Sequence, residues 1–240
     1  MGATWSDSPH LSQEAQDRLW ASIPVYQRDA RTKGIPQLGA GAIWPFPESE
    51  IKIPALEIKR FWRRLHAIDA QPLWKTSVTG AYDPDTGIVY ITHVWKREQV
   101  EPAVHVQALK AIGDWIPAVG DCSGLVQDAD RRQYLDIYRA CGLEISLAKK
   151  GVESGIQIVY DLMAAGQFKV FDTCEKWFDE FRSYRRKPGG QIIKQNDHAL
   201  DATRYLCVDL EKAIVQPKPE EPEPTIILEG PAREFGWMMS

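Results

Sequence analysis

The fold class is decided by the run Thr76-Ser77-Val78-Thr79-Gly80-Ala81-Tyr82-Asp83-Pro84-Asp85-Thr86-Gly87-Ile88-Val89-Tyr90-Ile91-Thr92-His93-Val94. Two stretches rich in β-branched and aromatic residues flank the turn-forming segment 83–87. This pattern predicts a β-hairpin with strands at 76–82 and 88–94.

The segments on either side of the hairpin extend this pattern. A strand at 65–69 precedes the hairpin, so three strands follow one another as a meander. After the hairpin we expect helices at 101–113, 130–141, 152–165, 172–184 and 197–213, and strands at 115–121, 143–147 and 168–171. A meander followed by alternating helices and strands predicts an α/β fold with a mixed sheet flanked by helices.

Acidic residues stand where this topology would bring them together. Asp69 ends the first strand and Asp121 ends the fourth, and active sites of such sheets gather at the carboxyl ends of strands. His198 and Asp201 lie three residues apart near the start of the last helix, so they share one face of it. Asp197 is either a helix N-cap or part of a metal site, and the residues alone allow both readings.

A cluster of Asp69, Asp121 and Asp201 would need a counter-charge. Two carboxylates about 4 Å apart repel by roughly 4 kcal/mol at an effective dielectric near 20, so a cation or a proton must relieve them. Oxygen ligands suit Mg²⁺ or Mn²⁺, and an imidazole such as His198 shifts the preference toward Mn²⁺. Two such ions can promote phosphodiester hydrolysis. The alternative is that each acid simply ends a strand in solvent.

Charge is unevenly distributed along the chain. The net charge of −4 argues against a generally basic nucleic-acid binder, but five basic residues and no acid lie between 182 and 194. Segment 185–194 contains Pro188-Gly189-Gly190 and predicts a small basic β-hairpin. The candidate contacts to DNA phosphates are Arg185, Arg186, Lys187 and Lys194 on this hairpin and Lys149 and Lys150 after the fifth strand.

Several protein classes are excluded by what the sequence lacks. No segment is apolar and long enough to span a membrane, the N-terminus lacks the apolar core of a signal peptide, and no GxxxxGK[ST] loop for ATP occurs. The four cysteines are widely spaced, as expected of reduced cysteines in a cytosolic protein.

A family resemblance is carried by several motifs: Tyr82-Asp83-Pro84-Asp85-Thr86-Gly87, Glu101-Pro102-Ala103-Val104-His105-Val106, Trp115-Ile116-Pro117 through Asp121, Phe181-Arg182-Ser183-Tyr184-Arg185-Arg186 and Asn196-Asp197-His198-Ala199-Leu200-Asp201-Ala202-Thr203-Arg204-Tyr205. With them, about residues 4–210 resemble the nuclease domain of the large terminase subunit of tailed double-stranded DNA phages.

The resemblance implies an RNase H-like fold and a two-metal, Mg²⁺- or Mn²⁺-dependent endonuclease. Such a nuclease cuts concatemeric double-stranded DNA with little sequence specificity during headful packaging. In that family the acids matching Asp69, Asp121 and Asp201 hold the metals, and a histidine matching His198 can assist. The implied partners are double-stranded DNA, the portal or procapsid, the small terminase subunit and an ATPase domain absent from this chain, and the implied location is the host-cell cytoplasm.

The resemblance also suggests a division of the chain. Residues 1–56 would be a lead-in from the missing ATPase domain, 57–214 the nuclease domain, and 215–240 a flexible acidic tail whose apolar end docks on the portal.

The chain departs from the family pattern just after the first acid, Asp69. The family usually has a glycine shortly after it, whereas this chain has Asp69-Ala70-Gln71-Pro72, which predicts a differently shaped entrance and weaker activity.

Two other functions remain open at this point. The domain could be a catalytically silent module that grips DNA and docks the packaging motor. It could also be an RNase H-like resolvase or transposase, which would prefer branched DNA.

Overall fold

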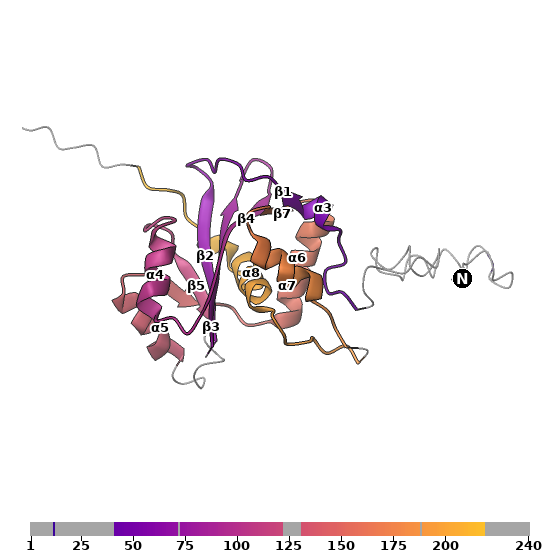
Figure 1. Cartoon of the computed structure of the whole chain (residues 1–240). Coiled ribbons are helices and arrows are strands. Elements are labelled where there is room, and N and C mark those ends of the chain that lie inside the picture. Colours follow the sequence, from indigo (N-terminus) through magenta and orange to yellow (C-terminus); the bar gives the residue numbers. More distant parts are fainter. Residues whose placement is uncertain (1–11, 13–40, 72, 122–130, 188, 219–240) are drawn as a thin grey trace, which may run out of the picture.

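A computed structural model describes residues 12, 41–71, 73–121, 131–187 and 189–218. Within them, a seven-stranded sheet carries helices on both faces (Figure 1). The strands are β1 (Lys52–Ile53), β2 (Arg63–Ala70), β3 (Trp74–Tyr82), β4 (Val89–Glu98), β5 (Ala118–Asp121), β6 (Ile145–Leu147) and β7 (Phe168–Phe171). The helices are α3 (Glu48–Ile51), α4 (Pro102–Lys110), α5 (Arg131–Ala140), α6 (Val152–Ala164), α7 (Glu175–Ser183) and α8 (His198–Val208).

The sheet is mixed, in the strand order β1-β7-β4-β3-β2-β5-β6. The meander β2-β3-β4 is antiparallel, and parallel strands extend it on both sides. The predicted hairpin is therefore confirmed, and so is the mixed sheet flanked by helices. Asp83 closes the hairpin turn, because its carboxylate accepts hydrogen bonds from the Asp85 amide at 3.0 Å and the Thr86 hydroxyl at 2.7 Å.

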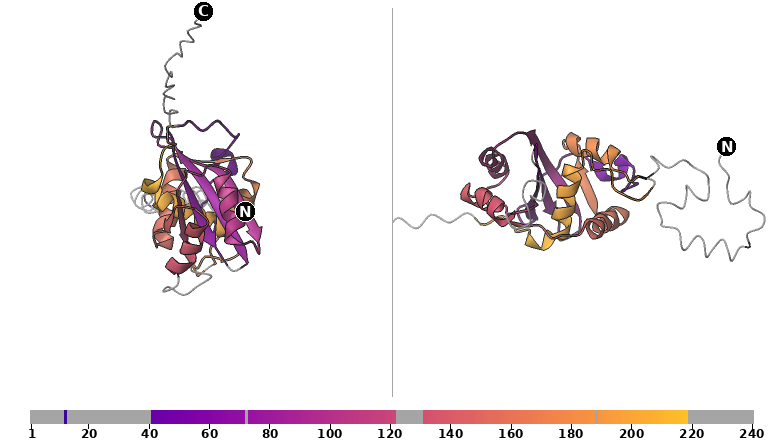
Figure 2. Two further views of the ribbon diagram at one scale, coloured as in Figure 1. Left: turned by 90° about the vertical axis from the view of Figure 1, so that its left-hand side faces the viewer. Right: turned by 90° about the horizontal axis from the view of Figure 1, so that it is seen from below.

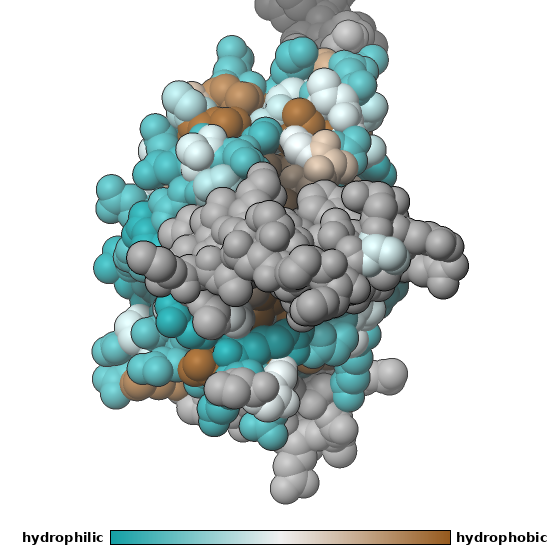
Figure 3. Space-filling view, turned by 90° about the vertical axis from the view of Figure 1, so that its right-hand side faces the viewer, coloured by the Kyte–Doolittle hydropathy of each residue, from teal (hydrophilic) through white to brown (hydrophobic). Residues whose placement is uncertain are grey.

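Two helical layers cover the sheet. Helices α6, α7 and α8 lie on one face and α4 and α5 on the other, as the edge-on view in Figure 2 shows. The larger core lies under the three-helix layer and contains fully buried Trp177, Phe168 and Leu200. On the side viewed in Figure 3, the described surface is mostly hydrophilic, as expected where helices turn their apolar faces inward.

Helix α8 lies unusually close to the centre of the sheet because β3 has a glycine beneath it. A Cβ atom at Gly80 would stand 2.6 Å from the Leu206 Cδ1 atom of α8. The absence of a side chain at this position lets the helix approach the strands. The helix thus brings its first turn over the ends of β2 and β5, where the candidate acids lie.

The opposite layer holds buried histidines of a structural kind. The His105 ring lies 2.9 Å from Ser77 Oγ and 3.2 Å from the Tyr138 hydroxyl, and His66 Nδ1 lies 2.8 Å from Thr79 Oγ1. Burial lowers the pKa of both His66 and His105 to about 3, so both rings are neutral at pH 7. Because side chains alternate along β2, His66 points away from the face on which Asp69 lies.

Some elements differ from the sequence prediction. Helix α3 and strand β1 lie in the expected lead-in, for which no helix or strand was predicted above, and β1 pairs in parallel with β7 at the sheet edge. The last helix ends at Val208 and is followed by a 3-10 turn, Leu210–Lys212. The basic hairpin is a turn with a single bridge between Arg186 and Ile192.

The boundaries of the expected domains are only partly visible. The lead-in up to residue 40 and the tail from 219 onward lie outside the described residues. The segment after residue 40 is attached to the basic hairpin, because Ala42 bridges Arg185 and the Arg186 amide donates to the Gly41 carbonyl at 2.7 Å. None of the helices in the described ranges is both long and apolar enough to cross a membrane.

Candidate active site

Strands β2 and β5 place two of the candidate acids side by side. The parallel register pairs Asp69 with Asp121, and partners in a parallel pair point to the same face of the sheet. Helix α8 packs across that face and carries His198 and Asp201 in its first turn. The strand ends and the start of α8 therefore meet at one place.

Asp69 is almost fully buried, with 1% of its surface exposed, and its carboxylate is fully engaged. His198 Nδ1 lies 2.9 Å from Oδ2 and donates to it, because an ionised carboxylate can only accept. Gln71 Nε2 donates to Oδ1 at 3.1 Å, so the residue that marks the departure from the family closes one side of this acid. Burial and the Asp201 charge raise the pKa of Asp69, and the bonds from His198 and Gln71 oppose that shift.

The Asp69 carboxylate favours the protonated form of the His198 imidazole. The hydrogen bond to Asp69 is the main cause that raises the pKa of His198, and burial opposes it. The imidazole is thus held in one orientation by the carboxylate, as in carboxylate–histidine pairs beside metals.

Asp201 is held by two cations of the protein itself. Its carboxylate accepts from Lys194 Nζ at 2.9 Å and from Arg204 Nη2 at 2.6 Å. Asp197, which the sequence left open as a cap or a site residue, makes no side-chain capping bond. Its Oδ2 atom is buried without a hydrogen bond, and Lys194 Nζ lies 3.1 Å away as an ion-pair partner. Asp197 therefore belongs to the acidic cluster.

Tyr205 stands among all three candidate acids. Its hydroxyl donates to Asp121 Oδ2 at 3.4 Å. Burial raises the pKa of Tyr205, and the charges of Asp69, Asp201 and Asp121 raise it further, in that order. The Tyr205 hydroxyl thus contacts Asp121 of β5, and its pKa also responds to the charges of Asp69 and Asp201.

The donor set can be tested against a divalent ion. Carboxylates with one imidazole are the ligands that Mg²⁺ and Mn²⁺ accept. Within the described part of the chain, however, no three side chains of His, Cys, Asp or Glu stand close enough to hold an ion together. In this structure the Asp201 oxygens are occupied by Lys194 and Arg204. The residues fit such an ion chemically once a carboxylate oxygen of Asp201 is released.

A buried acid on another helix fixes the position of α8. Glu180 of α7 accepts from the Ala199 amide at 2.7 Å and from Lys96 Nζ at 2.7 Å. Burial raises the pKa of Glu180, and the Lys96 contact opposes the shift. The residue thus satisfies one of the unpaired amides at the start of α8, next to His198. Nothing in the sequence marked Glu180, whereas Arg204 could have been found from its spacing of three residues to Asp201.

The basic residues expected to contact DNA are distributed over different places. Lys149 and Lys150 line a hollow of about 220 Å³ together with Asp121, Arg204 and Tyr205. Lys149 also pairs with Glu211, an exposed contact that adds little stability.

The hairpin residues do not act as one group. Arg186 pairs with Glu153 of α6 at 2.6 Å, and Lys187 is exposed. Lys194 pairs with Asp201 and Asp197, while Arg185 lines a hollow beside Trp44 and Tyr184. Contact with DNA remains a prediction for all of them.

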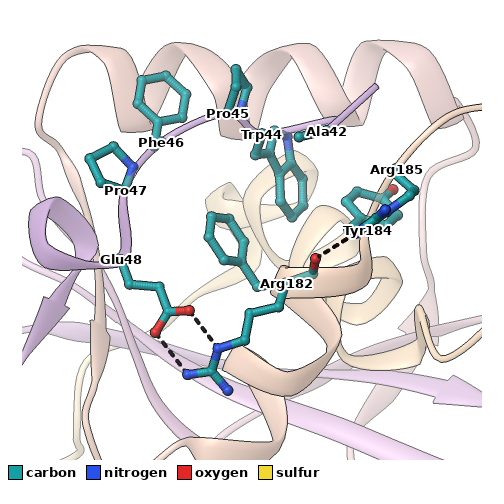
Figure 4. Close-up of a pocket in the computed structure, with 10 residues that line it drawn as sticks. Ala42, Trp44, Pro45, Phe46, Pro47, Glu48, Arg182, Tyr184 and Arg185 are labelled. Carbon is teal, nitrogen blue, oxygen red and sulfur yellow. Dashed lines mark hydrogen bonds and ion pairs between the residues drawn. The ribbon is translucent and has the colours of Figure 1, made fainter. Parts of the chain in front are cut away.

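A second hollow, larger than the one beside Asp121, lies away from the acids. It has a volume of about 430 Å³, and Phe181 is among the residues that line it. Trp44 and Phe46, also in the lining, are labelled in Figure 4. At its edge Glu48 and Arg182 form a two-bonded ion pair at 2.6 and 2.8 Å. An apolar hollow with this lining offers no group for phosphodiester chemistry, so it is not the candidate site.

Known proteins similar to this chain agree with one another. The family model described as Terminase RNaseH-like domain matches residues 78–210. The large terminase subunit of Enterobacteria phage LP7 is 36% identical over 214 residues, which cover 83% of this chain and 44% of that protein. This chain therefore spans less than half the length of that relative.

Solved structures give the same picture. The nuclease domain of the P22 large terminase has a TM-score of 0.69 and 31% identity, over 75% of this chain and 97% of that one. The large terminase nuclease domain of bacteriophage SPP1 with bound Mn has a TM-score of 0.51 and 18% identity, over 66% of this chain and 96% of that one. The second likeness is one of fold.

Proposed function

This chain belongs to the family of terminase RNase H-like domains, and from that we propose that it is a metal-dependent endonuclease domain of a viral DNA-packaging terminase. Its substrate is double-stranded DNA, which it cuts with little sequence preference as part of headful packaging. The observation that supports the proposal is that Asp69 and Asp121 are partners on adjacent parallel strands, while α8, which carries His198 and Asp201, packs against both strands.

Each residue has a role in this proposal. Asp69, Asp121 and Asp201 hold one or two Mg²⁺ or Mn²⁺ ions, and His198 orients the Asp69 carboxylate through its Nδ1 hydrogen bond. Such ions, when bound, supply an activated water and stabilise the leaving oxygen of a phosphodiester. The SPP1 domain of the same fold has bound manganese, in line with the choice of ion. Lys149 and Lys150, in the hollow beside Asp121, are placed to attract a phosphate of the strand to be cut.

A plasmid assay tests this function. Supercoiled DNA incubated with the 240-residue chain and Mn²⁺ should be nicked and linearised, and EDTA should stop the reaction because the carboxylates alone cannot activate water. Binding of Mn²⁺ by calorimetry gives a readout that does not depend on cutting. Preference for a branched substrate over the plasmid would instead favour a resolvase.

A second candidate function has one observation in its favour. Lys194 and Arg204 neutralise Asp201 in this structure, as expected if the domain only grips DNA and docks the motor. DNA binding without any Mn²⁺ binding or Mn²⁺-dependent cutting would establish this silent module and reject the nuclease.

The proposed partners beyond DNA are the portal or procapsid, the small terminase subunit and the ATPase domain. We place portal docking in the tail, whose acidic, proline-rich part precedes Ile226-Ile227-Leu228 and Phe235-Gly236-Trp237-Met238-Met239. Deleting residues 219–240 should weaken portal binding and leave DNA cutting unchanged, because the deletion begins after Pro217, whose carbonyl is held by Arg60. A pull-down with purified portal protein measures this, and undiminished binding would place the docking site elsewhere.

A further inference from the structure

The ammonium group of Lys194 lies between two buried carboxylates. Nζ is 2.9 Å from Asp201 Oδ2 and 3.1 Å from Asp197 Oδ2. The side chains of Asp201 and Asp197 are only 11% and 7% exposed, whereas that of Lys194 is 57% exposed. Because buried acids without a counter-charge are costly, a cation is expected at this position, either an ammonium group or a metal ion.

The two cations that contact Asp201 differ in how they are held. Arg204 belongs to α8 itself, is 2% exposed, and lies with its guanidinium 5.4 Å from the centre of the Tyr205 ring. Lys194 belongs to the segment between α7 and α8, outside any helix or strand, and reaches the acids with a solvent-exposed stem. Lys194 can therefore leave Asp201 without disturbing a helix, and Arg204 cannot.

We propose that Lys194 is a built-in competitor of the metal ion: its ammonium neutralises Asp201 and Asp197 in the metal-free protein and must be displaced before a divalent ion can use Asp201. This inference rests on the proposed metal-dependent function and adds a regulatory residue to it. The contact occupies an oxygen of Asp201, and the described residues form no three-ligand group although the strand register and α8 bring the acids to the same end of the sheet. It also makes metal affinity depend on a residue outside the ligand set.

Calorimetric titration of Mn²⁺ into the full chain tests the proposal with three variants. Lys194→Met should bind Mn²⁺ about tenfold more tightly than wild type, because a positive charge next to the ion is removed. Lys194→Arg keeps the charge and should stay close to wild type.

The matched control is Lys212→Met. Lys212 pairs with buried Asp209 at 2.8 Å and at the same spacing of three residues as Lys194 and Asp197, but Asp209 lies about 12 Å along α8 from Asp201. This variant changes the net charge equally and should leave Mn²⁺ affinity unchanged. An equal increase in Mn²⁺ affinity in Lys194→Met and Lys212→Met would show that the effect comes from net charge, and it would overturn the proposal.

A second measurement needs no variant. Acetylation of lysines by an N-hydroxysuccinimide ester, followed by peptide mass spectrometry, should modify Lys194 several-fold faster when Mn²⁺ is added, while Lys212 reacts at the same rate. If Lys194→Met does not fold, the labelling of wild type tests the proposal alone. An acetylation rate of Lys194 that Mn²⁺ does not change would overturn it.

The outcomes separate this inference from the function on which it rests. If wild type binds Mn²⁺ and Lys194→Met binds it equally or more weakly, Lys194 does not compete with the metal ion. The metal-dependent nuclease function is then unaffected. Absence of Mn²⁺ binding in both proteins overturns the metal dependence, and the competition with it.

Discussion

Asp69→Asn should lower Mn²⁺-dependent plasmid cleavage on the order of 10³-fold, the size of effect seen when one group of a preorganised charged site is removed. The amide keeps the shape of the side chain, but it removes the negative charge that a metal ion needs at the end of β2. Mn²⁺ affinity should fall as well. Initial rates of plasmid nicking and calorimetric titration measure the two effects.

The unfolding temperature of Asp69→Asn shows whether its loss of activity comes from the missing charge or from unfolding. Burial raises the pKa of Asp69, which means that the fold disfavours its ionised form at neutral pH. A neutral asparagine is therefore expected to unfold at the same temperature as wild type or above it. Asp85→Asn is the matched control, because Asp85 is an exposed turn residue and should keep full activity. An Asp69→Asn protein that retains more than about a tenth of the wild-type rate would remove Asp69 from the site.

Glu180→Ala should lower the free energy of unfolding by about 3–5 kcal/mol, the cost of breaking a buried ion pair on one side. The change leaves Lys96, whose side chain is 10% exposed, without its carboxylate, and the Ala199 amide without an acceptor. Chemical denaturation with urea measures the loss. Because the Ala199 amide follows directly on His198, Mn²⁺ binding should weaken in the same variant.

Two further variants test whether the contacts of the Glu180 side chain cause this loss of stability. Glu175→Ala removes an exposed acid from the first turn of the same helix and should change the free energy of unfolding by less than about 0.5 kcal/mol. Glu180→Gln keeps a carbonyl oxygen for the Ala199 amide and should lie between wild type and alanine. A loss below about 1 kcal/mol in Glu180→Ala would mean that α8 is positioned by packing alone.

The sequence predicts this fold where local chemistry and topology agree. The hairpin around 83–87 follows from turn residues between β-branched runs, and the strand-end rule then brings Asp69 and Asp121 together. What it does not predict depends on contacts between distant segments. Strand β1 has two residues, too few for an alternating pattern, and exists because β7 offers an edge. The role of Glu180 depends on α7 packing beside α8, which no spacing in the sequence records.

The interaction partners of the acidic side chains also could not be predicted from the sequence. Spacing along α8 puts Asp197 and Asp201 on one face, but their partners are set by where segment 185–194 folds back. The sequence predicts a DNA-binding hairpin there, and in the structure its last basic residue, Lys194, contacts the acids.

The bridge between Ala42 and Arg185 ties the upstream chain to this same segment. Gly41 has a φ of 91°, and a Cβ atom there would stand 2.6 Å from the Arg186 carbonyl oxygen, so the two backbones touch without room for a side chain. Any displacement that arrives at Gly41 from the preceding residues must either part the two strands of backbone or carry Arg185 and Arg186 with it. A displacement of Gly41 would therefore be felt at Arg185 and Arg186, the start of the segment whose last basic residue, Lys194, contacts Asp201.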